Sequence, residues 1–424
     1  PSCSSPSCTW GVDMLSTRGA MLGFFVLTSM AGGIRSAFAW TDDNPAAASQ
    51  CSAVDVNDAG TLVENCKVAD ASTAYMVLSG STAQLSPLSS TPGGVPCSAT
   101  AINNAQAGHE TIIGRCNDGN NVSQAVAWSS SAPSSPLQLM PVSGLLGIGA
   151  GVRTRAVDVS AQGTVIGSSF DASGSSVPVY WNPGSGTANA LPIPLLAQQM
   201  NCAPTSINNT ASPSIVGNCP AANGKSAAVL WNSVSSAYAT LPVPSGASYC
   251  DADQVNAKGQ ILGNCRYGTD TYRAVVWGAG GTGPSVLMTV NGNSAQRSIG
   301  AHLNDTGMVA VDYLAQGAQA GFYEPALWNP AGSDASAITL PSGAIHGTVL
   351  GLGNNGKMIG NFETSGGDTH PFHVEPNSLA AVDDGSPEGG PNAAVTAYSP
   401  GGTMEAGQGE NSNDAQQAIV QAIP

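Results

Sequence analysis

The chain has 424 residues, of which only 9% are charged, and it carries a formal net charge of −15 with a sequence pI of about 4.4. Because phosphate backbones are bound by clustered Lys and Arg, 12 such residues against 27 Asp and Glu lead us to expect no nucleic-acid partner. The acidic, Gly-rich composition suits an exported bacterial protein.

The start of the chain has the features of an export signal. Residues 1–13 fit no role, and we interpret them as lying upstream of the true start. From Met14 a short basic start precedes the apolar run Ala20–Ala31 and the Ala37-Phe38-Ala39 tripeptide, an A-x-A cleavage signal. The apolar run is too short to span a membrane. We therefore expect residues 14–39 to be a signal peptide and the mature protein to be secreted or periplasmic, without a membrane span.

Residues 51 to about 382 repeat one unit seven times. In its clearest copy, Cys250–Val290, short apolar runs between Gly, Asn and Asp clusters indicate four strands and three turns. One turn position, taken here as the origin of each unit, follows an apolar residue every time; it is occupied by Asn57, Asn103, Ser160, Asn208, Asn256, Asn304 and Gly353.

The intervals between origins run from 46 to 57 residues, and most are 48 or 49. A unit of this length with four strands is typical of a β-propeller blade. We therefore predict an all-β fold, a seven-bladed β-propeller of about 48-residue four-stranded repeats over residues 40–382. A linear β-solenoid is the alternative, although its coils are usually shorter.

Two further positions recur inside the unit. The second strand carries a glycine, which marks a bulge or a close backbone approach, at Gly114, Gly167, Gly217, Gly263 and Gly360. The third strand ends in a tryptophan beside apolar neighbours, at Trp128, Trp181, Trp231, Trp277 and Trp328. This fixed register favours packing between blades over a carbohydrate-binding platform.

Eight of the ten cysteines form pairs, and the first member of each lies six residues before an origin: Cys51/Cys66, Cys97/Cys116, Cys202/Cys219 and Cys250/Cys265. If Asn57–Gly60 is a four-residue turn, Val56 pairs with Thr61 and Cys51 lies opposite Cys66, close enough for a disulfide. Each bond would then join the first and second strands of one blade.

The repeats without these cysteines lack both members together, at Thr154/Ser169, Ser298/Tyr313 and Gly347/Phe362. This joint loss favours four disulfides over a metal site, which would need a CxxC half-site. Disulfides agree with an oxidising compartment.

The seventh repeat shows only three clear strands, so closing the ring requires one more. We expect Leu379–Val382 or Trp40–Gln50 to supply it. Residues 383–424 are rich in Gly, Pro and Ala and contain no Lys or Arg, a composition typical of disorder. We expect an acidic disordered tail whose deletion leaves thermal stability nearly unchanged.

The pattern A-x-x-I-N-x-x-G-x-I-V-G followed by A-V-x-W, clearest in repeats four, five and seven, resembles the HAF-repeat family of exported bacterial repeat proteins. His370-Pro371-Phe372 stands where that family carries its His-Ala-Phe triplet. The resemblance covers residues 51–376 and implies a propeller-like exported protein. It implies no established activity and transfers no functional residues.

Few residues suggest chemistry. The repeats contain no GxSxG, HExxH, P-loop or CxxC motif. Asp251-x-Asp253 and Asn117–Asn120 lack the spacing and the closing Glu of a calcium loop. His370 and His373, near Asp368 and Glu375, fall in register with the third strand, so the repeat pattern explains them better than a metal does. We expect no metal and no cofactor.

Two sets of residues remain as candidate sites. The first set lies two positions before the origin, on the first strand, which lines the channel of a propeller. Asp55, Asp158 and His302 at this position are candidate catalytic residues. The alternative is that they only line a water-filled channel. The largest departures from the repeat are candidate binding loops: Ala105–Glu110 with Gly108 and His109, Thr210–Pro213, and Val142–Val152.

Catalytic propellers usually bring several acids, His or Arg to the channel, and this chain has only 12 Lys and Arg and five His. That scarcity favours a non-catalytic, monomeric binding module for a protein or cell-surface ligand. The alternatives are an extracellular hydrolase or lyase with its site at the channel, and a structural surface component.

Overall fold

The computed structural model describes residues 41–42, 45, 49–68, 71–78, 81–88, 96–143, 150–193, 201–221, 224–269, 271–318, 321–386, 390–410 and 416–423. The predicted signal peptide, the residues before it and most of the loop 142–152 lie outside these ranges. Among the described residues, no helix has the length and apolar character needed to cross a membrane.

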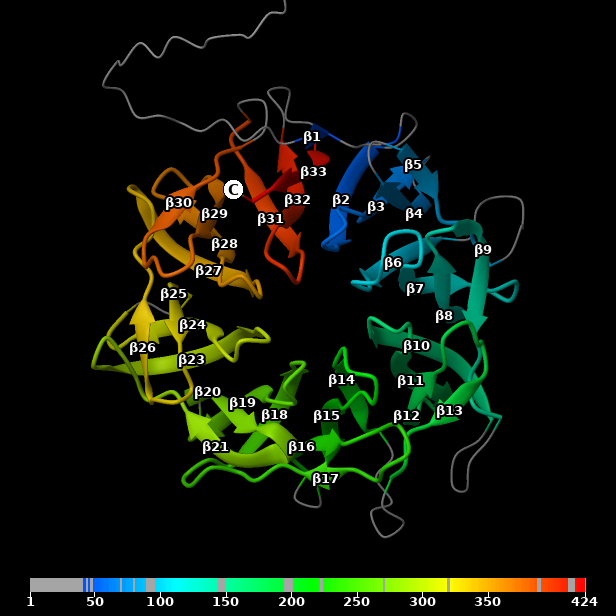
Figure 1. Cartoon of the computed structure of the whole chain (residues 1–424), viewed down its shortest axis with the longest axis horizontal. Helices are drawn as coiled ribbons and strands as arrows, with labels where there is room; N and C mark the ends of the chain where they lie inside the picture. The colour runs from blue at the N-terminus through cyan, green and yellow to red at the C-terminus, as the bar shows by residue number, and fades with distance from the viewer. Residues whose placement is uncertain are drawn as a thin grey trace, which may run out of the picture. The chain divides into compact units, whose positions relative to one another are not determined.

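Each of the seven repeats forms one four-stranded antiparallel blade, as predicted, and the blades follow one another around a ring (Figure 1). The strands of blades one to four are β2 (Ser49–Val56), β3 (Leu62–Val68), β4 (Ala71–Leu78), β5 (Ser81–Gln84); β6 (Cys97–Ile102), β7 (Thr111–Asn117), β8 (Ser123–Ser129), β9 (Ala132–Leu139); β10 (Gly151–Val159), β11 (Val165–Asp171), β12 (Ser176–Trp181), β13 (Ala188–Ala190); β14 (Ala203–Ile207), β15 (Ile215–Pro220), β16 (Ser226–Trp231) and β17 (Ala239–Thr240).

The strands of blades five to seven are β18 (Tyr249–Val255), β19 (Ile261–Tyr267), β20 (Thr271–Gly278), β21 (Thr282–Val286); β23 (Asn293–Leu303), β24 (Val309–Ala315), β25 (Glu324–Trp328), β26 (Asp334–Ala337); β27 (Ala344–Leu352), β28 (Met358–Thr364), β29 (Thr369–Val374) and β30 (Ala381–Asp383). Blade five also holds the 3-10 turn η1 (Ala279–Gly281), and a short strand β22 (Thr289–Val290) pairs with β23 and β26 of blade six. The apolar core lies between neighbouring blades, each cluster combining side chains of two of them.

The ring holds one blade more than the seven predicted from the repeats. Strands β31 (Ala393–Tyr398), β32 (Met404–Glu410) and β33 (Gln416–Ala422) form a sheet, and β1 (Thr41–Asp42) pairs with β33 as its fourth strand (Figure 1). This sheet bridges blades seven and one: Asn361 Nδ2 donates to Val395 O at 2.9 Å, and Thr396 Oγ1 donates to Ala53 O at 2.7 Å. The linear solenoid is thereby ruled out.

The prediction of a disordered tail after residue 382 was wrong. Along β31 the side chains alternate between buried and half-buried, and the buried ones, Ala393, Val395 and Ala397, are small. Ala397 packs with Val56 and Leu62 of blade one, and Val395 packs with Ile359 of blade seven. Of the segments expected to close the ring, Ala381–Asp383 completes blade seven and Thr41–Asp42 completes blade eight.

Every blade has a β-bulge in its first strand, at the same place relative to the turn that follows. In blade five, Val255 pairs with Ile261 and Ala252 pairs with Gly263, so one extra residue lies between Ala252 and Gln254. A Cβ on Gly263 would lie 2.1 Å from Asp251 O, which explains why this position is glycine in most repeats. The expected close approach at these glycines is confirmed.

All four predicted disulfides are formed, each within a single blade, with Cα–Cα distances of 4.0 to 4.2 Å. The predicted pairing of Val56 with Thr61 was wrong by one residue, since Val56 pairs with Leu62. The bulge shifts the register back, so that Cys97 faces Cys116 and Cys250 faces Cys265 on paired strands. Four disulfides indicate an oxidising, exported environment.

In blade four, the expectation that both cysteines lie on paired strands was wrong. Cys219 lies on β15, where it pairs with Ala227 of β16, but Cys202 comes directly before β14, whose pairing with β15 begins at Ala203. The chain turns just ahead of Cys202, because Asn201 has a φ of 72° and its side chain accepts Ser176 N at 3.0 Å. The Cys202–Cys219 bond therefore ties the lead-in of the first strand to the second strand, at a Cα–Cα distance of 4.1 Å.

Blade one departs from the expected pairing in a similar way. The pairing of β2 with β3 is irregular between Ser49 and Ser52, so Cys51 lies outside the regular ladder. Its Cα nevertheless lies 4.0 Å from that of Cys66, and the two sulfurs are bonded.

The five register tryptophans are buried between blades, with exposed fractions of 0 to 1%. In four of them the indole N–H donates to a carbonyl of the preceding blade, as Trp277 Nε1 does to Pro242 O at 2.8 Å. Trp328 donates within its own blade, to Gly332 O at 2.9 Å. The prediction of packing is confirmed, and these rings cannot serve as a sugar platform.

The origin asparagine joins two neighbouring blades. Asn256 Oδ1 accepts the N–H groups of Lys258 and Gln260 at 3.1 and 2.9 Å, which holds the turn of its own blade. Its Nδ2 donates to Asn304 O of the next blade at 2.9 Å. The same bridge runs from Asn57, Asn103, Asn208 and Asn304. One buried side-chain amide thus forms hydrogen bonds both within its own turn and to the next blade, which explains why Asn recurs at the origin.

We expect Asn256→Ala to lower the free energy of unfolding by about 2 kcal/mol or more, because buried N–H and C=O groups lose their partners. Asn256→Ser should cost less, since Ser160 at the same position in blade three still accepts Thr164 N at 3.2 Å. Urea denaturation with disulfides intact measures both changes. An Asn256→Ala loss no larger than that of Asn182→Ala, an exposed asparagine in a turn of blade three, would contradict this role for the origin.

Candidate functional site

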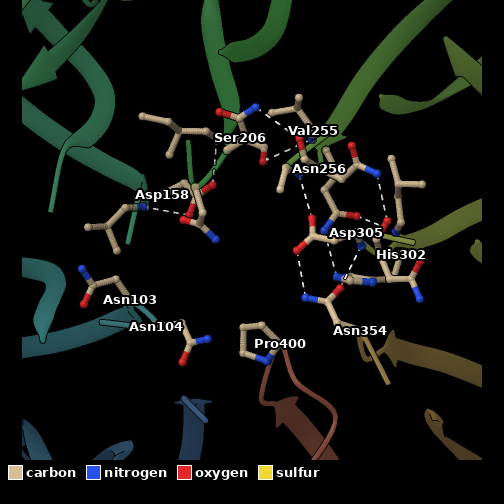
Figure 2. Close-up of a pocket in the computed structure, with 18 of the residues that line it drawn as sticks. Asn103, Asn104, Asp158, Ser206, Val255, Asn256, His302, Asp305, Asn354 and Pro400 are labelled. Atoms are coloured by element: carbon tan, nitrogen blue, oxygen red, sulfur yellow. Dashed lines mark hydrogen bonds between the residues drawn. The ribbon is translucent and has the colours of Figure 1, made fainter. Parts of the chain in front are cut away.

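A polar cavity of about 340 Å³ lies where the turns between first and second strands meet at the centre of the ring (Figure 2). The structure brings the three candidate catalytic residues, Asp55, Asp158 and His302, to its lining, together with Gln254 and Tyr398. Each comes from the first strand of a different blade, where the bulge turns the side chain toward the channel.

Both carboxylates are engaged in holding blades together. Asp55 accepts Val56 N with Oδ1 and Ile102 N of blade two with Oδ2, both at 2.9 Å. Asp158 repeats this arrangement with Val159 N at 2.8 Å and Ile207 N of blade four at 3.0 Å. In blades one and three, the side chain two positions before the origin therefore accepts a backbone N–H from the next blade.

Blade five makes the same link with an amide. Gln254 Oε1 accepts Leu303 N of blade six at 2.7 Å, and its Nε2 lies 2.8 Å from His302 Nε2. Since an amide Nε2 only donates, His302 Nε2 accepts and the imidazole proton resides on Nδ1. The His302 ring also meets the Tyr398 ring edge-on at 5.0 Å.

Burial governs the ionisation of this cavity. Burial raises the pKa of Asp55 to about 7, although the hydrogen bonds from Ile102 N and Val56 N act to lower it. Burial also raises the pKa of Asp158. Burial lowers the pKa of His302 to about 4, so the ring is neutral at neutral pH. A pKa near 7 would suit a general acid, but both oxygens of Asp55 already accept backbone N–H groups. No Lys or Arg is among the described residues lining the cavity.

Sequence reasoning missed the polar rim of the cavity. The residue after each origin is often Asn or Asp, and it links neighbouring turns: Asp305 N donates to Asn354 Oδ1 and Asn354 Nδ2 donates to Asp305 Oδ2, both at 2.8 Å (Figure 2). Asn104 and Asp58 form the same pair between blades two and one. The recurrence of Asn or Asp after the origin was the available signal.

The insertion Ala105–Glu110 forms one wall of a groove of about 520 Å³ against the turn of blade three, lined by Gln106, His109, Gln162 and Pro183 among others. Buried Glu110 fixes this wall, since its carboxylate accepts Gly108 N at 2.7 Å and hydroxyl hydrogen bonds from Thr61 and Ser130. Burial opposes ionisation of Glu110, but these hydrogen bonds keep its pKa below the usual value.

The other candidate loops do not join this groove. Pro213 lies in the turn between β14 and β15, outside the residues lining the groove, and Gly108 supports the wall through its N–H. Most of Val142–Val152 lies outside the described residues. Of Gly108, His109 and Pro213, His109 is the residue that lines this groove, together with its loop neighbours Ala105 and Gln106.

His370 and His373 of the seventh repeat do not converge on one site. His370 Nδ1 lies 3.3 Å from Asp383, whereas His373 Nδ1 lies 2.5 Å from Asp384. Glu64 lies beside Cys51 and Cys66, but these sulfurs are joined in a disulfide and cannot be thiolate ligands.

No protein-family model and no curated protein matches the sequence. Among solved structures, the chain is similar to a prolyl endopeptidase with a TM-score of 0.54 and 11% identity, over 80% of this chain and 49% of that one. It is similar to the Dos1 propeller with a TM-score of 0.52 and 6% identity, over 91% and 95%.

It is also similar to a puromycin hydrolase S511A mutant, with a TM-score of 0.51 and 12% identity over 87% of this chain. The chain spans about three fifths of the puromycin-hydrolysing peptidase structures it matches, 61% for that of Mycobacterium tuberculosis and 59% for the mutant hydrolase. At these identities the likeness shows the β-propeller fold alone.

Proposed function

We propose that this protein is an exported, non-catalytic β-propeller of the HAF-repeat kind that acts, as a monomer, as a binding module for a protein or cell-surface ligand. The observation that carries the proposal is that the two channel carboxylates are already fully engaged. In both Asp55 and Asp158, one oxygen accepts the N–H of the next residue in the same strand and the other accepts an N–H of the next blade. Groups fixed in this way maintain the ring and are poorly placed to transfer protons to a substrate.

Recognition is assigned to the groove beside Ala105–Glu110. The hydrogen bonds of Glu110 fix its wall, so a ligand meets a preformed surface with little ordering cost. His109 and Gln106 offer donors and acceptors there, next to the apolar ring of Pro183. Such a mixture of a few polar groups and apolar surface is typical of a ligand groove.

A hydrolase is the second candidate, favoured by the fold likeness to a prolyl endopeptidase and a puromycin hydrolase. About half of the endopeptidase chain has no counterpart here, since the match covers 49% of it. On this hypothesis Asp55 is the general acid, because its pKa of about 7 suits that role.

The test compares two variants on a glycan and surface-protein array, with a parallel turnover assay on chromogenic peptides and polysaccharides. The first replaces Ala105–His109 by Ala-Lys-Gly, the turn residues 257–259 of blade five; the second combines Asp55→Asn, Asp158→Asn and His302→Gln. We expect wild type and the channel variant to bind alike, the turn variant to lose at least tenfold in affinity, and none to turn over substrate.

Melting temperatures control for folding, since the channel variant removes blade-linking acceptors. Wild-type turnover that disappears in a folded channel variant would establish the hydrolase and reject the binding module. Binding unchanged in the turn variant would remove the groove as the recognition site.

A further inference from the structure

A second surface gathers cations and tyrosines at one end of blades four to six, in a chain whose net charge is −15. We call it the basic face and define it by Lys225, Arg266, Arg273, Arg297, Tyr249 and Tyr272. Its cations are four of the 12 Lys and Arg residues of the sequence. Arg266 lies near the end of β19 that is farthest from the Asn256 turn, so this face lies at the opposite end of the blade from the channel cavity.

The basic face is held in shape by cation–π contacts. The Tyr272 ring is approached by two guanidinium carbons, Arg266 Cζ at 5.7 Å and Arg297 Cζ at 5.6 Å from its centroid. Lys225 Nζ lies 6.0 Å from the Tyr249 ring, and the Tyr249 and Tyr272 hydroxyls are 3.3 Å apart. These contacts keep several positive charges close together in fixed positions, which favours an anionic ligand.

A groove of about 820 Å³ runs beside these residues, between blades five and six. Its lining contains one cation, Arg273, held by the carbonyl oxygens of Leu287 and Met288 at 3.4 and 3.2 Å. The rest of the lining is hydroxyl and amide side chains with small residues between them: Thr271, Ser294, Gln296, Gln316, Ala295, Gly317 and Ala318.

The chemistry of the groove selects among anionic ligands. Hydroxyl and amide groups suit the many hydroxyls of a sugar, and guanidinium groups pair with carboxylates in two parallel hydrogen bonds. An acidic peptide would also present apolar side chains, for which the described lining offers only alanines. We propose that the basic face binds an acidic polysaccharide, whose uronate carboxylates pair with Arg273 and Arg297 while its hydroxyls bond the groove.

The test is titration calorimetry at low ionic strength with polygalacturonate, using dextran as the neutral polysaccharide and poly-glutamate as the acidic peptide. The variant is Arg273→Gln with Arg297→Gln. The matched control is Arg153→Gln, an exposed arginine that stacks 4.2 Å from the Phe170 centroid in blade three, outside the basic face. We expect binding of polygalacturonate only, at least tenfold weaker in the double variant, unchanged in the control, and weakened by added salt.

Poly-glutamate bound as tightly as polygalacturonate would make this a site for acidic proteins and overturn the proposal, as would unchanged affinity in the double variant. If the double variant does not fold, Thr271→Val with Gln316→Ala tests the groove without removing charge, and unchanged affinity again overturns it. The Ala105–His109 replacement should keep full polygalacturonate binding, so this result is independent of the proposed recognition groove.

Discussion

A chain that ends after Asp383 should lose a large part of its thermal stability, with a melting temperature lower by about 10 °C or more. The truncation removes β31, β32 and β33 and leaves β1 without a partner strand. It uncovers apolar side chains of blade one, including Val56 and Leu62, each 1% exposed in the complete ring.

The expected loss follows from the area uncovered. Exposing a buried Val, Leu or Ile side chain costs about 1.5 to 3 kcal/mol. Val56, Leu62 and Ile359 of blade seven all pack against blade eight. Their combined loss is comparable with the whole stability of a typical domain, about 5 to 15 kcal/mol.

Circular dichroism melting with disulfides intact measures this effect. A synthetic segment of residues 384–424 added to the truncated chain should restore part of the melting temperature, because blade eight docks between two preformed faces. A truncated chain that melts within about 2 °C of the complete one would show that blade eight contributes little to the ring.

The seven repeat blades were predictable because their signals are local. Cys250 and Cys265, or Gly263 and its bulge, lie within one hairpin, so counting residues was enough to place them together. The one-residue error at Val56 shows the limit of counting. The turn length and the bulge each shift the strand register by one residue in opposite directions. The spacing between the two cysteines reflects only the combined shift, so the sequence does not reveal either one separately.

The sequence of the eighth blade follows the repeat spacing, but its Gly-, Pro- and Ala-rich composition led to the prediction of disorder. Ser399 lies 46 residues after Gly353, within the range of the other intervals, with Val395 four residues before it and Gly407 in the second strand. The blade lacks the register Trp, and its fourth strand, Thr41–Asp42, comes from the other end of the chain. Pairing over that separation leaves no local pattern.

The channel position was predictable, but the role of its residues was not. Asp55 and Asp158 were placed correctly in the channel, whereas their bonds to Ile102 and Ile207 depend on the spacing between blades. The basic face could not be found for the same reason, because the contacts of Lys225 with Tyr249 and of Arg297 with Tyr272 depend on the packing of three blades.

The seam between blades seven and eight contains a buried ionisable cluster. Glu405 of β32 is 0% exposed, and its Oε1 accepts a hydrogen bond from Gln421 Nε2 of β33. Asp384 and Lys357 face it from blade seven. Asp384 is paired with His373 at 2.5 Å and Lys357 with Glu375 at 3.4 Å.

Burial raises the pKa of Glu405 from 4.5 to about 8; the negative charge of Asp384 adds to the rise, while the Gln421 hydrogen bond and Lys357 oppose it. Burial also raises the pKa of Asp384. A carboxyl whose pKa is higher in the folded protein holds its proton there after the unfolded chain has released it. Its contribution to stability is therefore complete below pH 4.5 and is lost as the pH rises through about 8.

We therefore expect the free energy of unfolding of the wild type to fall between pH 5 and pH 9, and Glu405→Gln to remove much of that fall. Glutamine keeps an oxygen that accepts the Gln421 hydrogen bond but carries no charge into the seam. The variant should be more stable than wild type at pH 9 by about 3 kcal/mol and nearly equal to it at pH 5. Urea denaturation at a series of pH values measures the difference. The matched control is Glu410→Gln on the same strand β32, whose carboxylate accepts Asn392 Nδ2 at 2.8 Å outside the seam cluster and whose replacement should leave the pH dependence unchanged. If Glu405→Gln follows the same pH profile as wild type, the ionisation of this seam does not govern how blade eight closes the ring.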